Sequence, residues 1–464
     1  MEVLTAAQAE PMQRAVAGGL ARHGVARGER IVVATTSGAA MLTLILGALR
    51  SGIVPVLLNS ALLADERAAL ERDAEPSLIV DDELLAQLLA GPPGELAPWP
   101  LARPMHYTSG TTGVPKGVWS GLLDEVEAAA LLAEEADQWG FGPADRHLVC
   151  SPFHHSVSIR FGGGTLLAGG TVVVLGRFDA AEALDAVATL GVTTSFMVPA
   201  HLQRIHAAAG GTLAPLGALR SLVHAGAPCP PPLQRAAVEA LDADRVWEFY
   251  GSTEGQFTAC SAREWLERPG TVGRARAGRR LAVAAADAEL DPLGRSAPLA
   301  PAGEGVVWCC PPSWGRFSYW GDADKTAQAW RSADGSGWFT VGDLGRIDDD
   351  GYLFLEGRRD DLIISGGVNV YPAEVERVLV DAPGVGEVAV FGRADERWGQ
   401  RVCAAVVPDP GGPAPDPEVI LGWARQHLAA HKRPKEVHVV DDLPRTSTGK
   451  VQRLRIAATL GVSG

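Results

Sequence analysis

A loop suited to binding an oxyanion lies at residues 106–118, which read HYTSGTTGVPKGV. Its glycines let backbone N–H groups approach a ligand closely, its four hydroxyls donate hydrogen bonds, and Lys116 adds a positive charge. The sequence is not a Walker A loop, because no Gly-Lys-Ser/Thr follows a glycine at the required spacing. Since a flexible surface turn has a similar composition, the function of this loop depends on the other motifs in the chain.

Lysine is scarce in this chain, and arginine is the usual base. Only five of the 41 basic residues are lysines, namely Lys116, Lys325, Lys432, Lys435 and Lys450. A lysine kept against such a bias indicates a place that needs a compact ammonium on a flexible stem. Lys116 and Lys450 each follow a segment rich in Gly, Ser and Thr, so both are candidate functional residues.

Three stretches downstream of the loop carry further motifs. They are EFYGSTEG at 248–255, GWFTVGDLGRIDDDGYLFLEGRRDDLIISGGVNVYPAEVE at 337–376 and LPRTSTGKVQR at 443–453. Together with YTSGTTGVPKG, they resemble the adenylate-forming superfamily of acyl- and aryl-CoA synthetases, nonribosomal adenylation domains and luciferases. Four long motifs in the correct order make this resemblance specific from about residue 100 to the C-terminus.

The resemblance implies that ATP and a carboxylate form an acyl adenylate and pyrophosphate, and that a thiol then attacks the adenylate. Tyr250 would stack on adenine, and Asp343 with Arg358 would bind the ribose. The positions expected to contact the nucleotide are Thr108, Ser109, Gly110, Thr111, Thr112, Gly113, Lys116, Gly226, Ala227, Pro228, Tyr250, Gly251, Asp343 and Arg358.

Charge on the phosphates must be offset during adenylation, and the resemblance assigns residues to this task. Glu254 matches a ligand of Mg²⁺, and Thr253 matches a hydroxyl that contacts phosphate. Outside this context, a Thr-Glu pair capping a helix would explain the same two residues. Lys450 matches the lysine that bridges the carboxylate and the α-phosphate, and Asp360 matches the pivot about which a small C-terminal domain rotates.

The second half-reaction, transfer to a thiol, rests on shorter motifs. Gly366 and Gly367 match the lining of the pantetheine tunnel. By resemblance to aryl-CoA ligases, Trp398 would stack on the CoA nucleotide, and Arg433 and Lys435 would contact its phosphates. The sequence departs from those ligases at His431, where an aromatic residue often stands.

The stretch SPFHHSVSIRFGGG at 151–164 matches the segment that gates the carboxylate of the acid. We assign the gate to His155, leave His154 as a packing residue, and expect Gly226 and Gly251 beside the acid. Arg160 indicates a second anionic or polar group on the substrate if it faces the pocket, and a structural salt bridge if it faces outward. The glycines after it are expected to leave space.

Alternating strands and helices must position these residues. Short buried strands such as TVVVLG, TTSFMVP, SLVHAG and RVWEFYG, with helices at 179–190 and 231–241, predict an α/β architecture. We expect a large N-terminal domain of packed α/β subdomains at 1–356, followed by a small, mobile α+β domain at 357–464. The uncharged run from Ile31 to Leu49 is interpreted as a strand, a turn and a helix, not a membrane span.

Composition limits the classes of function. The net charge of −14 argues against binding nucleic acid through bulk electrostatics. No secretory signal opens the sequence, and the six cysteines lack metal-ligand spacing, so we expect a cytoplasmic enzyme with free thiols. The N-terminal region is short for the superfamily, which favours a small aryl or short polar acid over a fatty acid.

The sequence therefore predicts an ATP- and Mg²⁺-dependent acid–CoA ligase. A stand-alone enzyme that loads the phosphopantetheine of a carrier protein is an alternative. Activation of another oxyacid, such as nitrite, for transfer to an amine is a second alternative. A nucleotide-binding sensor without turnover belongs to another class, and the presence of both Lys116 and Lys450 argues against it.

Overall fold

The computed structural model describes residues 1–59, 62, 64–108, 116–286, 291, 293–358, 361, 363–365, 368–395, 399–430, 432–445 and 451–460. Its contacts divide the chain into two compact units. The first comprises Met1–Arg280 with Cys309–Phe339, and the second comprises Leu281–Trp308 with Thr340–Gly464. The predicted boundary after residue 356 falls inside the second unit and stays a prediction.

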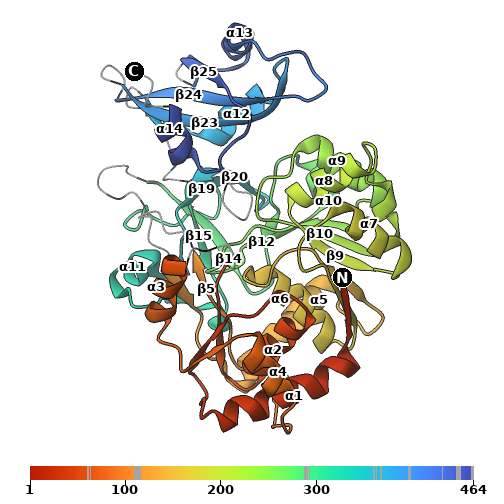
Figure 1. Cartoon of the computed structure of the whole chain (residues 1–464). Coiled ribbons are helices and arrows are strands. Elements are labelled where there is room, and N and C mark those ends of the chain that lie inside the picture. Colours follow the sequence, from red (N-terminus) through yellow and green to blue (C-terminus); the bar gives the residue numbers. More distant parts are fainter. Residues whose placement is uncertain are drawn as a thin grey trace. The chain divides into compact units, whose positions relative to one another are not determined.

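One part of the first unit is built around an eight-stranded sheet (Figure 1). Its five middle strands are parallel, as expected for buried strands that alternate with helices. The edge strand β1 pairs antiparallel with β8. In spatial order the strands are β1 (Glu2–Thr5), β8 (Thr171–Val174), β7 (Arg146–Val149), β9 (Thr194–Met197), β10 (Ser221–His224), β11 (Val246–Glu248), β12 (Thr258–Ser261) and β13 (Arg274–Ala275).

Helices cover both faces of this sheet. Side chains of Leu148, Leu222 and Val246 pack in one apolar core with the helices α7 (Ala180–Thr189), α8 (Pro199–Ala208) and α9 (Pro231–Leu241). The opposite face carries an aromatic core, formed with the helices α5 (Glu125–Trp139) and α6 (Ser156–Leu167). We call the buried residues of this second core the aromatic core; they are Trp139, Phe161, Phe196, Val223, Ala225 and Phe249.

A second, six-stranded sheet occupies the rest of the first unit. In spatial order its strands are β16 (Ser318–Tyr319), β6 (Lys116–Trp119), β5 (Met105–Thr108), β3 (Val54–Leu57), β2 (Arg30–Val33) and β4 (Leu78–Val80). The helices of this region are α1 (Ala6–Arg22), α2 (Ala39–Arg50), α3 (Ala64–Ala74) and α4 (Asp82–Leu89). The helices α10 (Ala262–Glu267) and α11 (Ala323–Ala329) and the hairpin of β17 (Trp330–Ala333) with β18 (Ser336–Phe339) complete the unit.

The uncharged run Ile31–Leu49 folds as predicted, into β2, a turn and α2. Eleven of the twelve residues of α2 are buried, because the helix contacts both α1 and α6. Burial of each Leu or Ile side chain in such a core contributes roughly 1.5–3 kcal/mol. Among the helices that the structure describes, none is long and apolar enough to cross a membrane.

The second unit contains two sheets. One is built from β14 (Arg280–Ala284), β15 (Gly303–Cys310), β19 (Asp343–Ile347) and β20 (Leu353–Arg358). The other orders β22 (Val368–Val370), β21 (Ile363–Ser365), β24 (Gly399–Pro408) and β23 (Val385–Asp395), with β25 (Glu436–Val439) also paired to β24. This second sheet has its own apolar core with the helices α12 (Pro372–Leu379) and α13 (Pro417–His427), while α14 (Arg453–Leu460) packs in a separate small core.

Candidate active site

The motif EFYGSTEG forms a tight turn between β11 and β12. The backbone N–H of Ser252 donates to the carbonyl of Gly255 at 2.7 Å, and that of Phe257 donates to the carbonyl of Tyr250 at 3.0 Å. The ring of Tyr250 stacks on that of Phe257, with 4.7 Å between the centroids. Thr253 and Glu254 lie in this turn and not at the start of a helix, so the helix-cap interpretation is wrong.

Glu254 is buried and held by a residue that the motif search missed. The Tyr319 hydroxyl on β16 donates to Oε1 of Glu254 at 2.8 Å. The ammonium of Lys325 lies 4.4 Å from the centroid of the Tyr319 ring, within the range of a cation–π contact. Only contacts in space link Tyr319 to Glu254, because 65 residues separate them along the chain.

Lys116 begins β6, next to the same short strand. Its ammonium lies 3.1 Å from Oδ2 of Asp322, three residues after Tyr319. The backbone N–H of Lys325 and the ammonium of Lys116 both lower the pKa of Asp322. The segment 318–322 thus contacts both Lys116 and Glu254. Thr108 ends β5 directly opposite Lys116, whereas Ser109, Gly110, Thr111, Thr112 and Gly113 lie outside the described residues.

The carboxylate of Glu254 fits the predicted Mg²⁺. Mg²⁺ is commonly held by one or two carboxylates together with substrate phosphates and water. No group of three or more His, Cys, Asp or Glu side chains suited to a metal occurs among the residues that the structure describes. Glu254 would therefore hold Mg²⁺ together with substrate phosphates and water, not as part of such a group of described side chains.

His155 occupies the N-cap position of α6, where helix N–H groups favour negative charge. Its ring lies 4.2 Å from that of His154. Burial lowers the pKa of His154 to about 4, as suits the packing role predicted for it. Four residues of α6 separate His155 from Arg160, which turns inward rather than to the surface: Nε of Arg160 lies 2.6 Å from Oε2 of Glu135, and only 16% of the Arg160 side chain is exposed.

The glycines that follow Arg160 do not open the acyl pocket, contrary to our expectation. A Cβ atom at Gly164 would lie 2.4 Å from the ring of Phe141, and one at Gly163 would lie 3.0 Å from Leu46 on α2. These glycines allow α6 to approach neighbouring side chains closely. The sequence could not distinguish the two roles, because both require the absence of a side chain.

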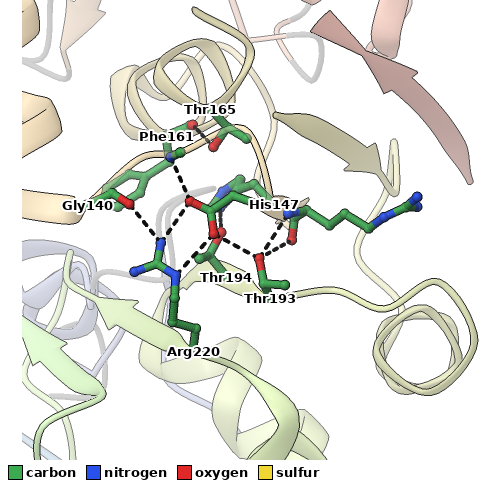
Figure 2. Close-up of polar contacts among 10 residues, drawn as sticks. Gly140, His147, Phe161, Thr165, Thr193, Thr194 and Arg220 are labelled. Atoms are coloured by element: carbon green, nitrogen blue, oxygen red, sulfur yellow. Dashed lines mark hydrogen bonds and ion pairs between the residues drawn. The ribbon is translucent and has the colours of Figure 1, made fainter. Parts of the chain in front are cut away.

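A second arginine–carboxylate contact joins Arg220 to Asp145; with Gly140, Gly142 and Thr193 we call it the Asp145 network, and Figure 2 labels its members Gly140, Thr193 and Arg220. Arg220 donates to Oδ1 of Asp145 at 3.1 Å, to Oδ2 at 2.8 Å and to the carbonyl of Gly140 at 3.1 Å. The Thr193 hydroxyl and the Gly142 N–H donate to the two carboxylate oxygens, at 3.1 and 3.0 Å. Each oxygen of Asp145 therefore accepts two hydrogen bonds.

The backbone that follows β10 has the conformation expected of a close approach to a ligand. Gly226 has φ of +94°, in the region that side-chain-bearing residues rarely adopt. Ala227 and Pro228 continue this turn, and His224 at the end of β10 is completely buried. Gly251 forms a β-bridge with Gln256 in the 250–257 turn.

In the second unit, the predicted ribose-binding pair lies on adjacent strands. Asp343 is buried at the start of β19 and is the direct partner of Arg358 on β20. Gly357 and Arg358 still belong to β20, so the predicted boundary after residue 356 lies within a strand. Arg433 donates from Nε to the carbonyl of Leu428 at 2.8 Å, and Lys435 is exposed.

Several predicted residues lie outside the described part of the second unit, namely Asp360, Gly366, Gly367, Trp398 and Lys450, as does His431. The segment that bears Lys450 is closed by a β-bridge between Arg445 and Val451. Arg453 then donates three bonds to Glu376 on α12, at 2.8, 2.9 and 3.2 Å, and one to Asp361 at 3.1 Å. Arg453, which the motif search did not single out, fixes the chain just after the predicted catalytic lysine.

Comparisons with known proteins agree with these features. Residues 2–100 and 101–309 match the model of the AMP-binding enzyme family, and residues 374–450 match that of the AMP-binding enzyme C-terminal domain. A fatty acid–[acyl-carrier-protein] ligase, ScoC, of Streptomyces coeruleorubidus is 32% identical, covering 97% of this chain and 90% of its own. A 2-succinylbenzoate–CoA ligase of Bacillus cereus is also 32% identical, covering 94% of this chain and 89% of its own.

Solved structures give the same result for the fold. ATP-bound MatB from Rhodopseudomonas palustris has a TM-score of 0.85 and 29% identity, covering 98% of this chain and 93% of that one. The predicted superfamily, α/β fold class and class of ATP-dependent acid–thiol ligase are confirmed. The chain belongs to the AMP-binding enzyme family, within the adenylate-forming superfamily.

Proposed function

We propose that this protein joins a small carboxylic acid to the thiol of CoA in two steps. In the first, a carboxylate oxygen attacks the α-phosphorus of ATP, and the bond from that phosphorus to pyrophosphate breaks. In the second, the thiolate sulfur attacks the acyl carbon, and the bond to AMP breaks. Two of the relatives named above are a fatty acid–[acyl-carrier-protein] ligase and a 2-succinylbenzoate–CoA ligase, which supports this proposal.

The observation that carries the proposal is the position of Lys116 and Glu254 in the first unit. Both contact the segment 318–322, Lys116 through Asp322 and Glu254 through Tyr319. In this arrangement the Lys116 ammonium would bind the phosphates of ATP, and the Glu254 carboxylate would bind the Mg²⁺ that accompanies the same phosphates. Mg²⁺, when bound to Glu254, neutralises part of the negative charge of the phosphates.

The remaining roles follow the motifs. Tyr250 would hold adenine, Asp343 would accept hydrogen bonds from the ribose hydroxyls, and Lys450 would offset the charge on the carboxylate and α-phosphate as they meet. His155 at the N-terminus of α6 would orient the acid. Asp360 would be the pivot that exchanges Lys450 for Gly366 and Gly367 when the thiol enters.

The position of the aromatic core supports a small acid, not a fatty acid, as the substrate. Ala225 and Phe249 belong to it, and they immediately precede Gly226 and Tyr250, the residues predicted to border the nucleotide and the acid. Tight aromatic packing at this position leaves little length for a fatty-acyl chain. We place the reaction in the cytoplasm, where ATP and CoA are available.

A carrier protein is the second candidate acceptor, because one relative is a fatty acid–[acyl-carrier-protein] ligase. Phosphopantetheine is common to both acceptors, so Gly366 and Gly367 would serve either one. Trp398, Arg433 and Lys435 would contact only the nucleotide of CoA. Substitution of Arg433 and Lys435 by alanine should therefore raise the KM for CoA and leave that for pantetheine unchanged.

A pyrophosphate-release assay tests the function directly. We expect release with ATP, Mg²⁺ and at least one acid from a panel of 2-succinylbenzoate, ferulate, indoleacetate, short aliphatic acids and their dicarboxylate counterparts. Addition of CoA should yield the thioester, identified by mass spectrometry. Release that requires nitrite instead of a carboxylate would replace the proposal with the oxyacid alternative, and absence of release with every acid would contradict it.

Lys450→Ala separates the two half-reactions. We expect loss of about two to four powers of ten in adenylate formation, as for removal of a charge-stabilising group, with thioester formation from presynthesised adenylate retained. A folded variant that loses both halves equally would refute the two-conformation scheme. Asp343→Ala should weaken AMP binding, and unchanged affinity by calorimetry would disprove the ribose assignment.

A further inference from the structure

An unbalanced group of charges lies beneath the aromatic core of the first unit. Two glutamates of α5 contact arginines from helix α6 and from the turn between β13 and β14. Arg103, in the stretch before β5, donates to the carbonyl of Trp314 at 3.1 Å, and its charge interacts with both glutamates. We call this group the arginine cluster; it consists of Arg103, Arg160, Arg276, Arg279, Glu134 and Glu135.

Each oxygen of the Glu134 and Glu135 carboxylates has at least one hydrogen-bond or ion-pair partner. Oε2 of Glu135 lies 2.6 Å from Nε of Arg160 and accepts a hydrogen bond from Nε1 of Trp139 at 3.1 Å, while Oε1 accepts from Nη2 of Arg276 at 2.9 Å. Oε1 of Glu134 lies 2.9 Å from Arg276 and 2.6 Å from Arg279. Its Oε2 accepts from Nε1 of Trp314. No oxygen of either carboxylate is without a partner.

The arginines, in contrast, have donors to spare. Nη2 of Arg160 and both Nε and Nη1 of Arg276 are buried and have no hydrogen-bond partner among the described residues. The Arg276 side chain is completely buried. Burial lowers the pKa of Arg160 to about 10, with Glu135 acting in the opposite direction, so the guanidinium stays charged at neutral pH. The four arginines therefore carry two more charges than the two glutamates neutralise.

Aromatic faces compensate only part of this excess. The guanidinium carbon of Arg160 lies 4.7 Å from the centroid of Phe249 and 5.5 Å from that of Trp139, and that of Arg276 lies 5.6 Å from Trp139. A cation–π contact is worth about 0.5–2 kcal/mol. An uncompensated buried charge costs several kcal/mol, so these contacts do not complete the site.

The position of Arg160 connects the cluster with the acid side of the proposed active site. Phe249, over which its guanidinium lies, directly precedes Tyr250, and α6 begins at the predicted gate His155. Arg160 keeps 16% of its side chain exposed, against 6% for Arg279 and none for Arg276. Of these three arginines, Arg160 is therefore the one whose side chain is most accessible.

We propose that Arg160 binds a second anionic group of the acid, a carboxylate in the simplest case, so that the enzyme selects dianionic substrates. The remaining arginines hold the surroundings positive, and Glu135 fixes the orientation of Arg160 through Nε. The inference deepens the proposed function and rests on it. The second anionic group would supply the partner that the excess arginine charge lacks among the described residues.

The test compares acids of equal size that differ by one charge. Two suitable pairs are butanedioate with 4-methylpentanoate and 1,4-benzenedicarboxylate with 4-isopropylbenzoate, in which an isopropyl group replaces one carboxylate. In pyrophosphate release, the wild type should favour the diacid in at least one pair. Arg160→Leu should lower the ratio of kcat/KM for diacid over monoacid about 10- to 1000-fold and raise activity toward the monoacid. Arg160→Lys should retain part of the preference.

Arg220→Leu is the matched control, because Arg220 is also paired with a buried aspartate but belongs to the balanced Asp145 network. It should leave the ratio unchanged. An unaltered ratio in folded Arg160→Leu would overturn the inference while leaving the ligase proposal intact. Absence of pyrophosphate release with every acid would instead defeat the proposed function.

Binding without catalysis supplies a measurement that survives if Arg160→Leu fails to fold. The diacid should raise the melting temperature of wild-type protein more than its matched monoacid, at equal concentration and ionic strength. Inorganic phosphate is the third probe. An equal rise with phosphate would indicate an inorganic-anion site, and an equal rise with the monoacid would indicate no anion selection; either result contradicts the inference.

Discussion

The arginine cluster and the Asp145 network are built from the same side chains and have opposite charge balance. In the network, one arginine meets one aspartate, and each carboxylate oxygen accepts two hydrogen bonds. In the cluster, three arginines contact two glutamates and Arg103 adds a fourth positive charge, and buried guanidinium donors have no protein partner among the described residues. The network is complete as a structural element, whereas the cluster lacks an anion.

This difference shows how to recognise a binding site among buried ion pairs. A buried ion pair is common in folded proteins and is weak support for function by itself. Unused donors of one sign are more informative, because a protein rarely buries them without a counter-ion. The four following predictions test whether the two regions differ as their charge balance requires.

Glu135→Gln should have the largest effect. It leaves four arginines with one carboxylate, and removal of one partner from a buried pair costs about 3–5 kcal/mol. Denaturant unfolding measures this loss, and Glu125→Gln, at an exposed position of the same helix, is the control. Burial raises the pKa of Glu135, but Arg160 and Arg276 outweigh this and keep it lowered, so the carboxylate is ionised at neutral pH. If Glu135→Gln lowers the unfolding free energy no more than Glu125→Gln does, Glu135 does not compensate the excess positive charge of the arginines.

Glu248 tests the converse case, a buried carboxyl group without an arginine. Burial raises its pKa to about 8, and its strand neighbour His224 offers no charge because burial lowers the pKa of that imidazole to about 4. Glu248 is thus neutral in the folded protein between about pH 5 and 8, while it is ionised in the unfolded chain.

The unfolding free energy should therefore fall as pH rises through this window, by about 1.4 kcal/mol per pH unit. Glu248→Gln should remove this contribution, so that wild type loses about 2–3 kcal/mol more than the variant between pH 5.5 and 7.5. Glu239→Gln, exposed on α9, is the control. Parallel pH profiles of wild type and Glu248→Gln would mean that Glu248 is ionised in the fold.

Arg220→Leu should lower the unfolding free energy by about 1–3 kcal/mol, because Asp145 loses its only arginine among the described residues but keeps the Thr193 and Gly142 hydrogen bonds. Its melting curve can be compared with that of Arg235→Leu, a substitution at an exposed arginine of α9. Equal curves would mean that the balanced network adds nothing to stability.

Arg160→Leu should have the smallest effect on stability, within about 1 kcal/mol of wild type in the absence of ligand, since it removes a charge already in excess. Glu135 retains Arg276 in this variant. The contrast with Arg220→Leu is the sharpest form of the comparison: the arginine that matters less for folding should matter more for the choice of acid. A larger destabilisation by Arg160→Leu than by Arg220→Leu would reverse the assignment of the two regions.

Much of the fold could be predicted from local patterns. The runs TVVVLG, TTSFMVP, SLVHAG and RVWEFYG form β8 to β11, and 179–190 and 231–241 contain α7 and α9. Each is a short apolar run or an amphipathic period that needs no distant partner to be recognised. The predicted helix at 179–190 ends at Thr189, because local periodicity does not specify where a helix stops.

The site could be predicted only where motifs are contiguous. Tyr250, Glu254 and Lys116 stand in recognisable stretches, but Tyr319 and Asp322 are single residues whose contacts arise from the pairing of β16 with β6. Arg160 could be singled out as unusual, whereas its environment could not. Glu135 and Arg276 are separated by 141 residues, and no local pattern joins them.

The pairing of β1 with β8 has a consequence for how the protein forms during synthesis. β1 emerges from the ribosome long before Thr171–Val174, the only strand with which it pairs among those described. Until β8 follows, the apolar side of β1 and the first helix have no sheet edge to dock on, and such early exposed segments are where nascent chains misassociate. The Glu2 carboxylate, which accepts a hydrogen bond from the Ala39 N–H in the folded protein, offers the segment an earlier partner. Chaperone contact with a nascent chain of this sequence should therefore begin at the first helix and end once β8 has left the exit tunnel.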